Sequence, residues 1–467
     1  MPIATTDPRT GKVLKTFDEL SDDQLEDRLA RAARAAAAYR LTSHDERAGW
    51  LRAAADILDK RTDEIAELMT LEMGKTKKAS AAEIGKCATA LRYYAENTAG
   101  FLADEPVDAD SVNASQAYAH YLPIGVVLAI MPWNFPLWQA MRFAAPALAA
   151  GNVGLLKHAS NVPQTALFME ELFHDAGFPD DVFQTLLIGS SKVDAVIRDN
   201  RVAAATLTGS EGAGVAVART AGEVLKKVVL ELGGSDPFVV MPSADLVQAA
   251  KVATTSRCQN NGQSCISAKR FIVHTDVYDE FVRLFAAEMS ALVVGDPMEE
   301  GTDVGPLATE QGREDVETLV RDAVDKGAEV LVGGERPDRE GWWYPPTLVS
   351  GVTEDMEMYL EEVFGPVAQV YRADDVEEAV RIANATRFGL GSNAWTNDPA
   401  EQEIFVRDLA AGQTFVNGMV ASFPALPFGG IKASGHGREL GAHGIREFTN
   451  IKTVWFGKTQ EPGGTQR

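Results

Sequence analysis

Cysteine is scarce in this chain of 467 residues, which contains only Cys87, Cys258 and Cys265. Three unevenly spaced cysteines exclude the disulfide framework of a small secreted domain and favour a reducing compartment. The seven histidines show no metal-ligand spacing with cysteines or carboxylates, so the sequence predicts no metal site. Internal repeats and low-complexity linkers are also missing.

Long apolar runs and an excess of positive charge are absent as well. The most apolar run, from 122 to 131, is too short to span a bilayer, and residues 1–6 do not resemble a signal peptide. Lys and Arg number 44 against 67 Asp and Glu, a formal net charge of -23. Nucleic acids and anionic membranes favour basic surfaces, so we expect neither as a partner and expect a cytoplasmic protein.

The chain has ample material for a globular fold. It is too long for one hydrophobic core, and its 45% hydrophobic and 8% aromatic residues suit two or three packed domains. Apolar residues recur at helical spacing over 23–40 and 45–73, which predicts amphipathic helices. Short strand-like runs then alternate with helical stretches over 125–232 and again over 236–416. This alternation predicts parallel sheets with helices on both faces, whose ligands bind at the carboxyl ends of the strands.

Two strand-like segments stand apart from this alternation. Residues 116–122 and 450–456 each read as a short isolated strand. Because an unpaired strand edge seeks a partner, we expect these segments to pair outside their own domain and the protein to form an oligomer.

The strongest clue to chemistry is a thiol that follows a glycine-broken, amide-rich turn, in Gln259-Asn-Asn-Gly-Gln-Ser-Cys265. Taken alone, Cys265 is more simply read as a small buried hydrophobe. Three other segments strengthen the catalytic reading, because they supply a base, an oxyanion donor and a cofactor clamp. They are Leu230-Glu-Leu-Gly-Gly234, Pro132-Trp-Asn-Phe-Pro136 and Leu156-Lys-His-Ala-Ser160.

These four segments, in their order along the chain, resemble those of the aldehyde dehydrogenase superfamily. Glu361-Glu-Val-Phe-Gly-Pro366 and Pro427-Phe-Gly-Gly-Ile-Lys432 add two more of its signatures, and the likeness extends to about Phe456. Within the superfamily the sequence is most similar to the bacterial succinate-semialdehyde dehydrogenases. The resemblance implies an α/β fold with two doubly wound domains and a small β oligomerisation arm, assembled as a homodimer or homotetramer. It assigns 1–108 and 126–235 to cofactor binding, 236–435 to catalysis, and 109–125 and 436–460 to the arm.

A cysteine-based oxidation needs three catalytic groups. A thiolate that adds to an aldehyde gives a thiohemiacetal able to release hydride, and Cys265 suits this role. The resemblance implies that the Asn134 amide and the Cys265 backbone N–H stabilise the oxyanion. Glu231, among apolar neighbours that would raise its pKa, is the expected base for thioester hydrolysis. The alternatives are a turn residue for Asn134 and a solvent-facing strand end for Glu231.

Two observations predict the cofactor-binding residues: a glycine-containing turn and the family resemblance. Gly209, Ser210 and Gly214 lie between a strand and a helix, where backbone N–H groups can meet a pyrophosphate. The resemblance implies further contacts with the ribose and nicotinamide groups. These residues are Trp133, Lys157, Ser160, Leu232, Glu362 and Phe364.

Ser160 bears on the choice of cofactor. Relatives that prefer NAD often carry a glutamate here, and a carboxylate about 4 Å from a 2′-phosphate would repel it by roughly 4 kcal/mol at an effective dielectric of 20. A serine can instead donate a hydrogen bond. We therefore expect NADP to be preferred and NAD to be accepted as well.

An anionic substrate requires local cations, because the protein itself is strongly acidic. The resemblance implies a carboxylate site formed by Trp138, Arg142 and Ser422, in which Arg142 binds the carboxylate through two hydrogen bonds. Some members of the group carry a second arginine six residues before the nucleophile, where this chain has Gln259. The alternative reading of Arg142 is a structural salt bridge.

The sequence thus predicts oxidation of succinate semialdehyde to succinate. The alternatives are another aldehyde substrate, such as glutarate semialdehyde or an uncharged aliphatic aldehyde, and a non-catalytic structural or binding protein of the same fold. The intact set of Cys265, Glu231 and Asn134 disfavours the non-catalytic reading. For Cys258, at the end of an expected helix, a packed thiol is favoured over a regulatory disulfide.

Overall fold

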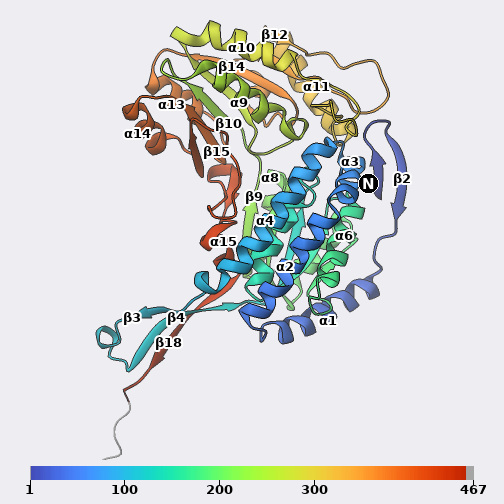
Figure 1. Cartoon of the computed structure of the whole chain (residues 1–467), viewed down its shortest axis with the longest axis vertical. Coiled ribbons are helices and arrows are strands. Elements are labelled where there is room, and N and C mark those ends of the chain that lie inside the picture. Colours follow the sequence, from blue (N-terminus) through green and yellow to red (C-terminus); the bar gives the residue numbers. More distant parts are fainter. Residues whose placement is uncertain (1, 459–467) are drawn as a thin grey trace, which may run out of the picture.

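A computed structural model describes residues 2–458 of the chain. Figure 1 shows two α/β bodies placed one above the other along the long axis, with a narrow β arm projecting from the lower one. Each body is built on its own, mostly parallel sheet. The predicted fold, two parallel α/β domains with a small separate β element, is confirmed.

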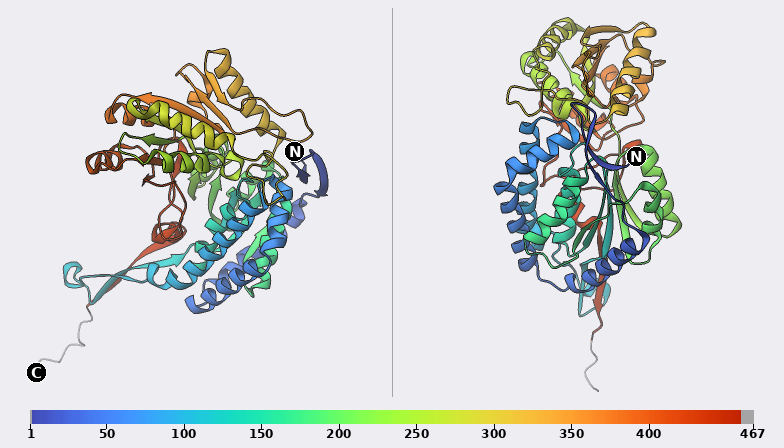
Figure 2. Two further views of the ribbon diagram at one scale, coloured as in Figure 1. Left: turned by 45° about the horizontal axis from the view of Figure 1, so that its top comes forward. Right: turned by 90° about the vertical axis from the view of Figure 1, so that its right-hand side faces the viewer.

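The lower body contains a six-stranded sheet that is parallel except for one edge strand. Its order is β17 (Gly435–His436), β9 (Lys227–Glu231), β8 (Val202–Thr208), β5 (Val126–Met131), β6 (Val153–His158) and β7 (Phe183–Thr185). Helices cover both faces, as the right-hand view of Figure 2 shows. They are α1 (Asp22–Tyr39), α2 (His44–Lys60), α3 (Thr62–Met73), α4 (Lys77–Phe101), α5 (Trp138–Ala149), α6 (Pro163–Asp175), α7 (Val193–Arg198) and α8 (Glu211–Glu223).

The N-terminal helices differ in part from the prediction. Residues 45–73, expected as one helical stretch, form α2 and α3 because the backbone leaves the helical region at Arg61 (φ -104°, ψ 15°). Ser43 starts α2 with a reciprocal capping box that includes Glu46. The sequence analysis missed α4 and the hairpin of β1 (Ile3–Asp7) and β2 (Lys12–Phe17). α4 matters for function because it packs against α5, the helix that follows the segment carrying the predicted oxyanion residue.

The upper body contains a seven-stranded sheet, again parallel except for one edge strand. Its order is β12 (Glu329–Val332), β13 (Thr347–Ser350), β14 (Val367–Ala373), β11 (Ala268–His274), β10 (Asp236–Val240), β15 (Gly391–Trp395) and β16 (Gln413–Val416). Phe238 and Val240 of β10 pack in one apolar cluster and Val239 in another, so the strand buries both faces, as parallel strands do. The helices are α9 (Leu246–Cys258), α10 (Tyr278–Ser290), α11 (Glu310–Asp325), α12 (Glu357–Leu360), α13 (Val376–Asn384) and α14 (Pro399–Asp408).

The arm is a three-stranded antiparallel sheet of β3 (Glu105–Val107), β4 (Gln116–Pro123) and β18 (Thr449–Phe456). β18 pairs with β4 along its whole length, from Thr449 opposite Pro123 to Phe456 opposite Gln116. The two strand-like segments that stood apart in the sequence therefore pair with each other in the arm. They are isolated only in sequence, because the C-terminal segment, which includes α15 (Gly441–Glu447), returns to the lower body.

Short 3-10 turns complete the described chain, at Asp110–Val112, Ser190–Lys192, Gln259–Gly262, Thr275–Val277 and Lys432–Ser434. Between residues 2 and 458, no helix combines the length and apolar character needed to cross a membrane. The parallel register aligns the carboxyl ends of β5, β8 and β9, with Ile130 opposite Leu207 and Thr208 opposite Glu231. This edge of the lower sheet faces the upper body and carries the site.

Candidate active site

A cavity of about 240 Å³ lies at this edge, where the lower sheet meets the loop that precedes β11. Its walls come from the segments after β5, β8 and β9, from the loop before β11 and from the segment after α12. The lining residues are Pro132, Trp133, Asn134, Gln139, Thr208, Gly209, Ser210, Leu232, Gly233, Cys265, Glu362 and Phe364. Cys265, Asn134 and most of the predicted cofactor residues are thus brought into one cavity.

The loop that carries Cys265 is held by two asparagines in an unusual backbone conformation. Asn260 and Asn261 are both left-handed, with φ of 54° and 57°, a conformation that asparagine tolerates better than most residues. The Asn260 amide donates to the Asn134 carbonyl at 2.7 Å, and the Asn261 amide donates to the Gly74 and Pro306 carbonyls at 2.9 Å each. These long-range hydrogen bonds hold the strained turn in a single conformation, and this fixes the position of the thiol.

The predicted oxyanion residue, Asn134, has a polar partner that the sequence analysis missed. Gln139 of α5 lines the cavity, and its amide nitrogen lies 3.4 Å from the Asn134 side-chain oxygen. The Asn134 amide nitrogen in turn donates to the Gln263 carbonyl at 3.2 Å. The available signal was that Gln139 interrupts an otherwise apolar helix, in which Arg142 is the other polar side chain.

Glu83 of α4 anchors the start of α5. Its Oε1 accepts hydrogen bonds from the backbone N–H groups of Leu137 (2.9 Å) and Trp138 (2.7 Å), which lack partners within the helix. The same carboxylate forms a buried ion pair with Lys75. Glu83 therefore fixes the turn between Asn134 and α5 from a segment about 50 residues earlier in the chain.

The Cys265 thiol is half-buried in the cavity wall. Burial raises the pKa of this thiol to about 12, and the charges of Arg142 and Lys269 act in the opposite direction. The thiol is therefore protonated at neutral pH in the described structure, and the attacking thiolate is a minor species.

Glu231, the predicted base, does not line the cavity. It ends β9, is 2% exposed, and neither of its carboxylate oxygens has a hydrogen-bond partner among the described residues. Its side chain points toward Gly429, where an added Cβ would lie 2.7 Å from its Oε1. Burial, and next the neighbouring Glu439 carboxylate, raise the pKa of Glu231 well above its usual range, while Arg142 opposes this.

None of the three predicted substrate residues lines the cavity. Arg142 makes a buried ion pair with Glu439 and lies over the Phe428 ring, 4.2 Å from its centre. The Trp138 indole N–H donates to the Ser422 hydroxyl at 3.1 Å. Arg142 is thus held by a protein carboxylate, as its structural reading suggested, although its Nη2 makes no hydrogen bond within residues 2–458.

The remaining predicted cofactor residues lie outside the cavity. Lys157 is the penultimate residue of β6 and is half-buried, and burial lowers its pKa while Glu19 opposes this. Ser160 lies three residues after Lys157, and the Ser160 backbone carbonyl accepts a hydrogen bond from the Ala4 N–H at 3.0 Å. Gly214 packs inside α8, where an added Cβ would lie 2.7 Å from Leu232, so it allows close packing of helix and strand. These positions continue along the same sheet edge.

The polar groups of the cavity suit a dinucleotide. Thr208 is buried and its hydroxyl has no hydrogen-bond partner among the described residues. Ser210 caps α8 by accepting from the Ala213 N–H at 3.4 Å, so the N-terminus of this helix opens at the cavity. A helix N-terminus attracts phosphate through its free N–H groups and its dipole. The rings of Trp133 and Phe364, which also line the cavity, pack edge to face with their centres 5.8 Å apart.

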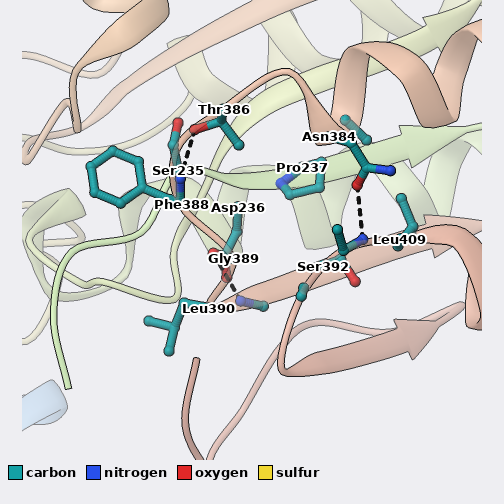
Figure 3. A pocket seen from close by; sticks show the side chains of 14 residues that line it. Ser235, Asp236, Pro237, Asn384, Thr386, Phe388, Gly389, Leu390, Ser392 and Leu409 are labelled. Atoms are coloured by element: carbon teal, nitrogen blue, oxygen red, sulfur yellow. Dashed lines mark hydrogen bonds between the residues drawn. The ribbon is translucent and has the colours of Figure 1, made fainter. Parts of the chain in front are cut away.

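A second, much smaller hollow has a volume of about 10 Å³, and Figure 3 shows side chains that line it. Asp236 projects into it beside Ser235 and accepts from the Gly391 N–H at 3.0 Å. Burial raises the pKa of Asp236 to about 7, with Lys269 opposing. Its volume leaves no room for a substrate. Across residues 2–458, no group of three or more His, Cys, Asp or Glu side chains could hold a metal ion.

A family model described as "Aldehyde dehydrogenase family" matches residues 1–454 of the chain. The chain belongs to the aldehyde dehydrogenase family. Its curated relatives include the succinate-semialdehyde dehydrogenase [NADP(+)] 1 of Mycobacterium tuberculosis (strain ATCC 25618 / H37Rv), which is 62% identical over 98% of this chain and 100% of the relative. The succinate-semialdehyde dehydrogenase [NADP(+)] of Mycobacterium avium (strain 104) is 60% identical over 99% of each chain.

Solved structures agree with this membership of the aldehyde dehydrogenase family. The succinic semialdehyde dehydrogenase of Streptococcus pyogenes, in complex with NADP+ as the cofactor, superposes with a TM-score of 0.95 at 39% identity. The superposition covers 98% of this chain and 100% of that one. The resemblance inferred from six short segments therefore holds over the whole fold.

Proposed function

We propose that this aldehyde dehydrogenase oxidises succinate semialdehyde to succinate with NADP+. The observation that carries the proposal is full-length identity of 62% to a relative named for this activity and cofactor. The cavity that joins Cys265 and Asn134 supplies the chemistry. The reaction takes place in the cytoplasm, consistent with three free cysteines in the described chain.

Cys265 is the nucleophile of the proposed mechanism. Its sulfur adds to the aldehyde carbon, and the oxygen of the resulting thiohemiacetal accepts hydrogen bonds from the Asn134 amide and the Cys265 backbone N–H. Gln139 and Gln263 hold that amide in the cavity wall. The bound dinucleotide supplies the acceptor for the hydride that leaves the substrate carbon.

Glu231 is the proposed base for hydrolysis of the thioester. In the described position its side chain is buried away from the cavity, and burial, which raises its pKa, favours the protonated form. To act on water, the side chain must turn from Gly429 toward Cys265, where hydration lowers its pKa again. In this proposal Glu231 therefore acts from a second position, turned into the cavity.

The lower body, 1–108 and 126–235, binds the cofactor in this proposal, and 236–435 carries the nucleophile. The pyrophosphate lies at the start of α8, beside Gly209 and Ser210, and Gly214 allows that helix its close packing. Lys157 and Ser160 hold the adenosine end and its 2′-phosphate, while Trp133, Leu232, Glu362 and Phe364 surround the nicotinamide end. NAD, which lacks the 2′-phosphate, is accepted less well.

Trp138, Arg142 and Ser422 bind the substrate carboxylate in this proposal, with Arg142 using its unoccupied Nη2. The segments 109–125 and 436–460, which contain β4 and β18 and whose residues 459–460 lie outside the described chain, join copies of the chain into a homodimer or homotetramer in this proposal. Exposed apolar side chains on β18 support this role, since Ile451 is 61% and Trp455 52% exposed.

The decisive experiment is a substrate panel measured with NADP+ and with NAD+. Succinate semialdehyde should show the highest kcat/KM, above glutarate semialdehyde and above uncharged butanal. A higher kcat/KM for either competitor would favour that alternative substrate. Absence of NADPH formation with every aldehyde would instead favour a non-catalytic role.

A further inference from the structure

Lys86 is a cation beside the proposed substrate site that the sequence analysis did not single out. It is half-buried on α4. Its Nζ donates to the Ser422 hydroxyl at 2.6 Å and lies 4.4 Å from the centre of the Trp138 ring. Trp138 is the neighbour of Gln139, which lines the cavity with Cys265. The Lys86 ammonium therefore contacts two of the three side chains proposed to bind the substrate carboxylate.

The hydrogen bonds around Ser422 leave one donor free. A hydroxyl can accept two hydrogen bonds and donate one. Ser422 accepts from Lys86 (2.6 Å) and from the Trp138 indole N–H (3.1 Å), and its own hydrogen has no acceptor within residues 2–458. Lys86 has three donors and uses one on Ser422. Adjacent hydroxyl and ammonium donors of this kind suit a carboxylate.

The surrounding charges distinguish Lys86 from its basic neighbours. Arg142 is paired with Glu439, and Lys75 with Glu83. Lys86 has no carboxylate within ion-pair distance anywhere in the described chain. A half-buried cation without a counter-charge is costly, and such groups cluster at ligand sites.

We propose that Lys86 is a specificity-determining residue whose ammonium, together with the Ser422 hydroxyl, binds the carboxylate at the far end of the substrate. The inference rests on the proposed function, because it requires a semialdehyde with a terminal carboxylate. It also explains how a chain with Gln259, where some relatives have a second arginine, supplies a second cation. The second cation comes from α4 instead of from the cysteine loop.

The proposal predicts a characteristic pH dependence. Burial, and next the positive charge of Arg142, lower the pKa of Lys86 to about 8. Lys75 acts in the same direction, while Glu83 and Cys87 oppose it. In the free enzyme Lys86 therefore loses its charge as the pH rises through about 8. The KM for succinate semialdehyde should rise over this interval, whereas the KM for butanal should not.

The test compares wild type, Lys86→Met and Lys86→Arg with succinate semialdehyde and butanal at saturating NADP+. Lys86→Met should raise the KM for succinate semialdehyde roughly tenfold to hundredfold, the effect of losing one charge-assisted hydrogen bond. Its kcat, and the kcat/KM for butanal, should stay within about threefold. Lys86→Arg should keep a low KM and abolish its dependence on pH between 7 and 9.5, because arginine does not titrate there.

Lys78→Met is the matched control, because Lys78 is an exposed lysine on the same helix. It should leave both substrates unaffected. Equal losses for succinate semialdehyde and butanal in Lys86→Met, or an unchanged KM for succinate semialdehyde, would overturn the inference. If Lys86→Met does not fold, the pH profile of Lys86→Arg decides, and a persisting rise in KM counts against the role.

The failure of the proposed function gives a different result. It would appear as a wild-type enzyme with no preference for succinate semialdehyde over butanal. A wild-type preference for the semialdehyde that survives in Lys86→Met would refute the role of Lys86 alone.

Discussion

The Lys269 ammonium donates a hydrogen bond of 2.7 Å to the backbone carbonyl of Cys265. It also donates to the Ser264 carbonyl at 2.8 Å and lies 3.2 Å from the Glu362 carboxylate. Lys269 is fully buried at the start of β11. One ammonium therefore joins the cysteine loop to a residue on the opposite wall of the cavity.

We predict that Lys269→Met lowers kcat by about tenfold or more. The substitution removes charge-assisted hydrogen bonds to the cysteine loop and leaves Glu362 without its counter-charge. It also removes a positive charge that lowers the pKa of Cys265, so iodoacetamide should alkylate the variant more slowly at pH 8. Steady-state kinetics and the alkylation rate are the two measurements. An unchanged alkylation rate would show that Lys269 does not act on the thiol.

The raised pKa of Cys265 predicts how its alkylation depends on pH. Since the thiol pKa lies near 12, the thiolate is a small fraction at neutral pH and grows as the pH rises. Inactivation of the apo enzyme by iodoacetamide should therefore accelerate roughly tenfold per pH unit from 7 to 9, without a plateau. Cys258→Ser is the control and should react alike, because Cys258 is 5% exposed. A plateau below pH 8 would contradict the prediction.

Ser160→Glu should reverse the cofactor preference. A new carboxylate near the proposed 2′-phosphate site would repel NADP by up to roughly 4 kcal/mol, while it could accept hydrogen bonds from the ribose hydroxyls of NAD. We expect kcat/KM for NADP to fall by about a hundredfold or more and that for NAD to fall little or rise. Ser160→Ala separates the charge from the loss of the hydroxyl. If NADP remains preferred in Ser160→Glu, the 2′-phosphate is bound elsewhere.

Glu83→Gln should lower both stability and turnover. Glutamine can still accept from the N–H groups of Leu137 and Trp138, but it leaves the buried Lys75 ammonium without a counter-charge. We expect a lower midpoint of thermal unfolding and a smaller kcat, because the turn after Asn134 loses rigidity. Glu340→Gln, which affects an exposed ion pair with Lys12, is the control and should change neither.

The predictions made from sequence succeeded where the signal was local. The turn around Cys265, the Asn134 segment and the strand that ends at Glu231 were each recognised from a few adjacent residues, and the alternation of strands and helices predicted both sheets. β4 and β18 were both found, but their pairing with each other could not be read from the sequence. Their pairing joins residues more than 300 positions apart, such as Gln116 and Phe456, which no local pattern indicates.

The partners of the recognised residues were not predictable for the same reason. Gln139 carried a weak signal as a polar residue in an apolar helix, whereas Lys86 and Glu83 lie in α4, which was not predicted from the sequence. The structure also separated Glu231 from the cavity and paired Arg142 with Glu439. Sequence motifs indicate which residues are candidates for the reaction, but they do not indicate how those side chains are oriented in the folded protein.

The sequence by itself indicated the family, the alternation of strands and helices and the proposed nucleophile, because each depends on residues that are neighbours in the chain. Only the tertiary structure decided which charges surround that nucleophile. Lys86 and Ser422 are 336 positions apart, yet their side chains meet at 2.6 Å. Such contacts arise because helices and loops from distant segments pack to bury their apolar faces, and this packing selects which polar groups share a site.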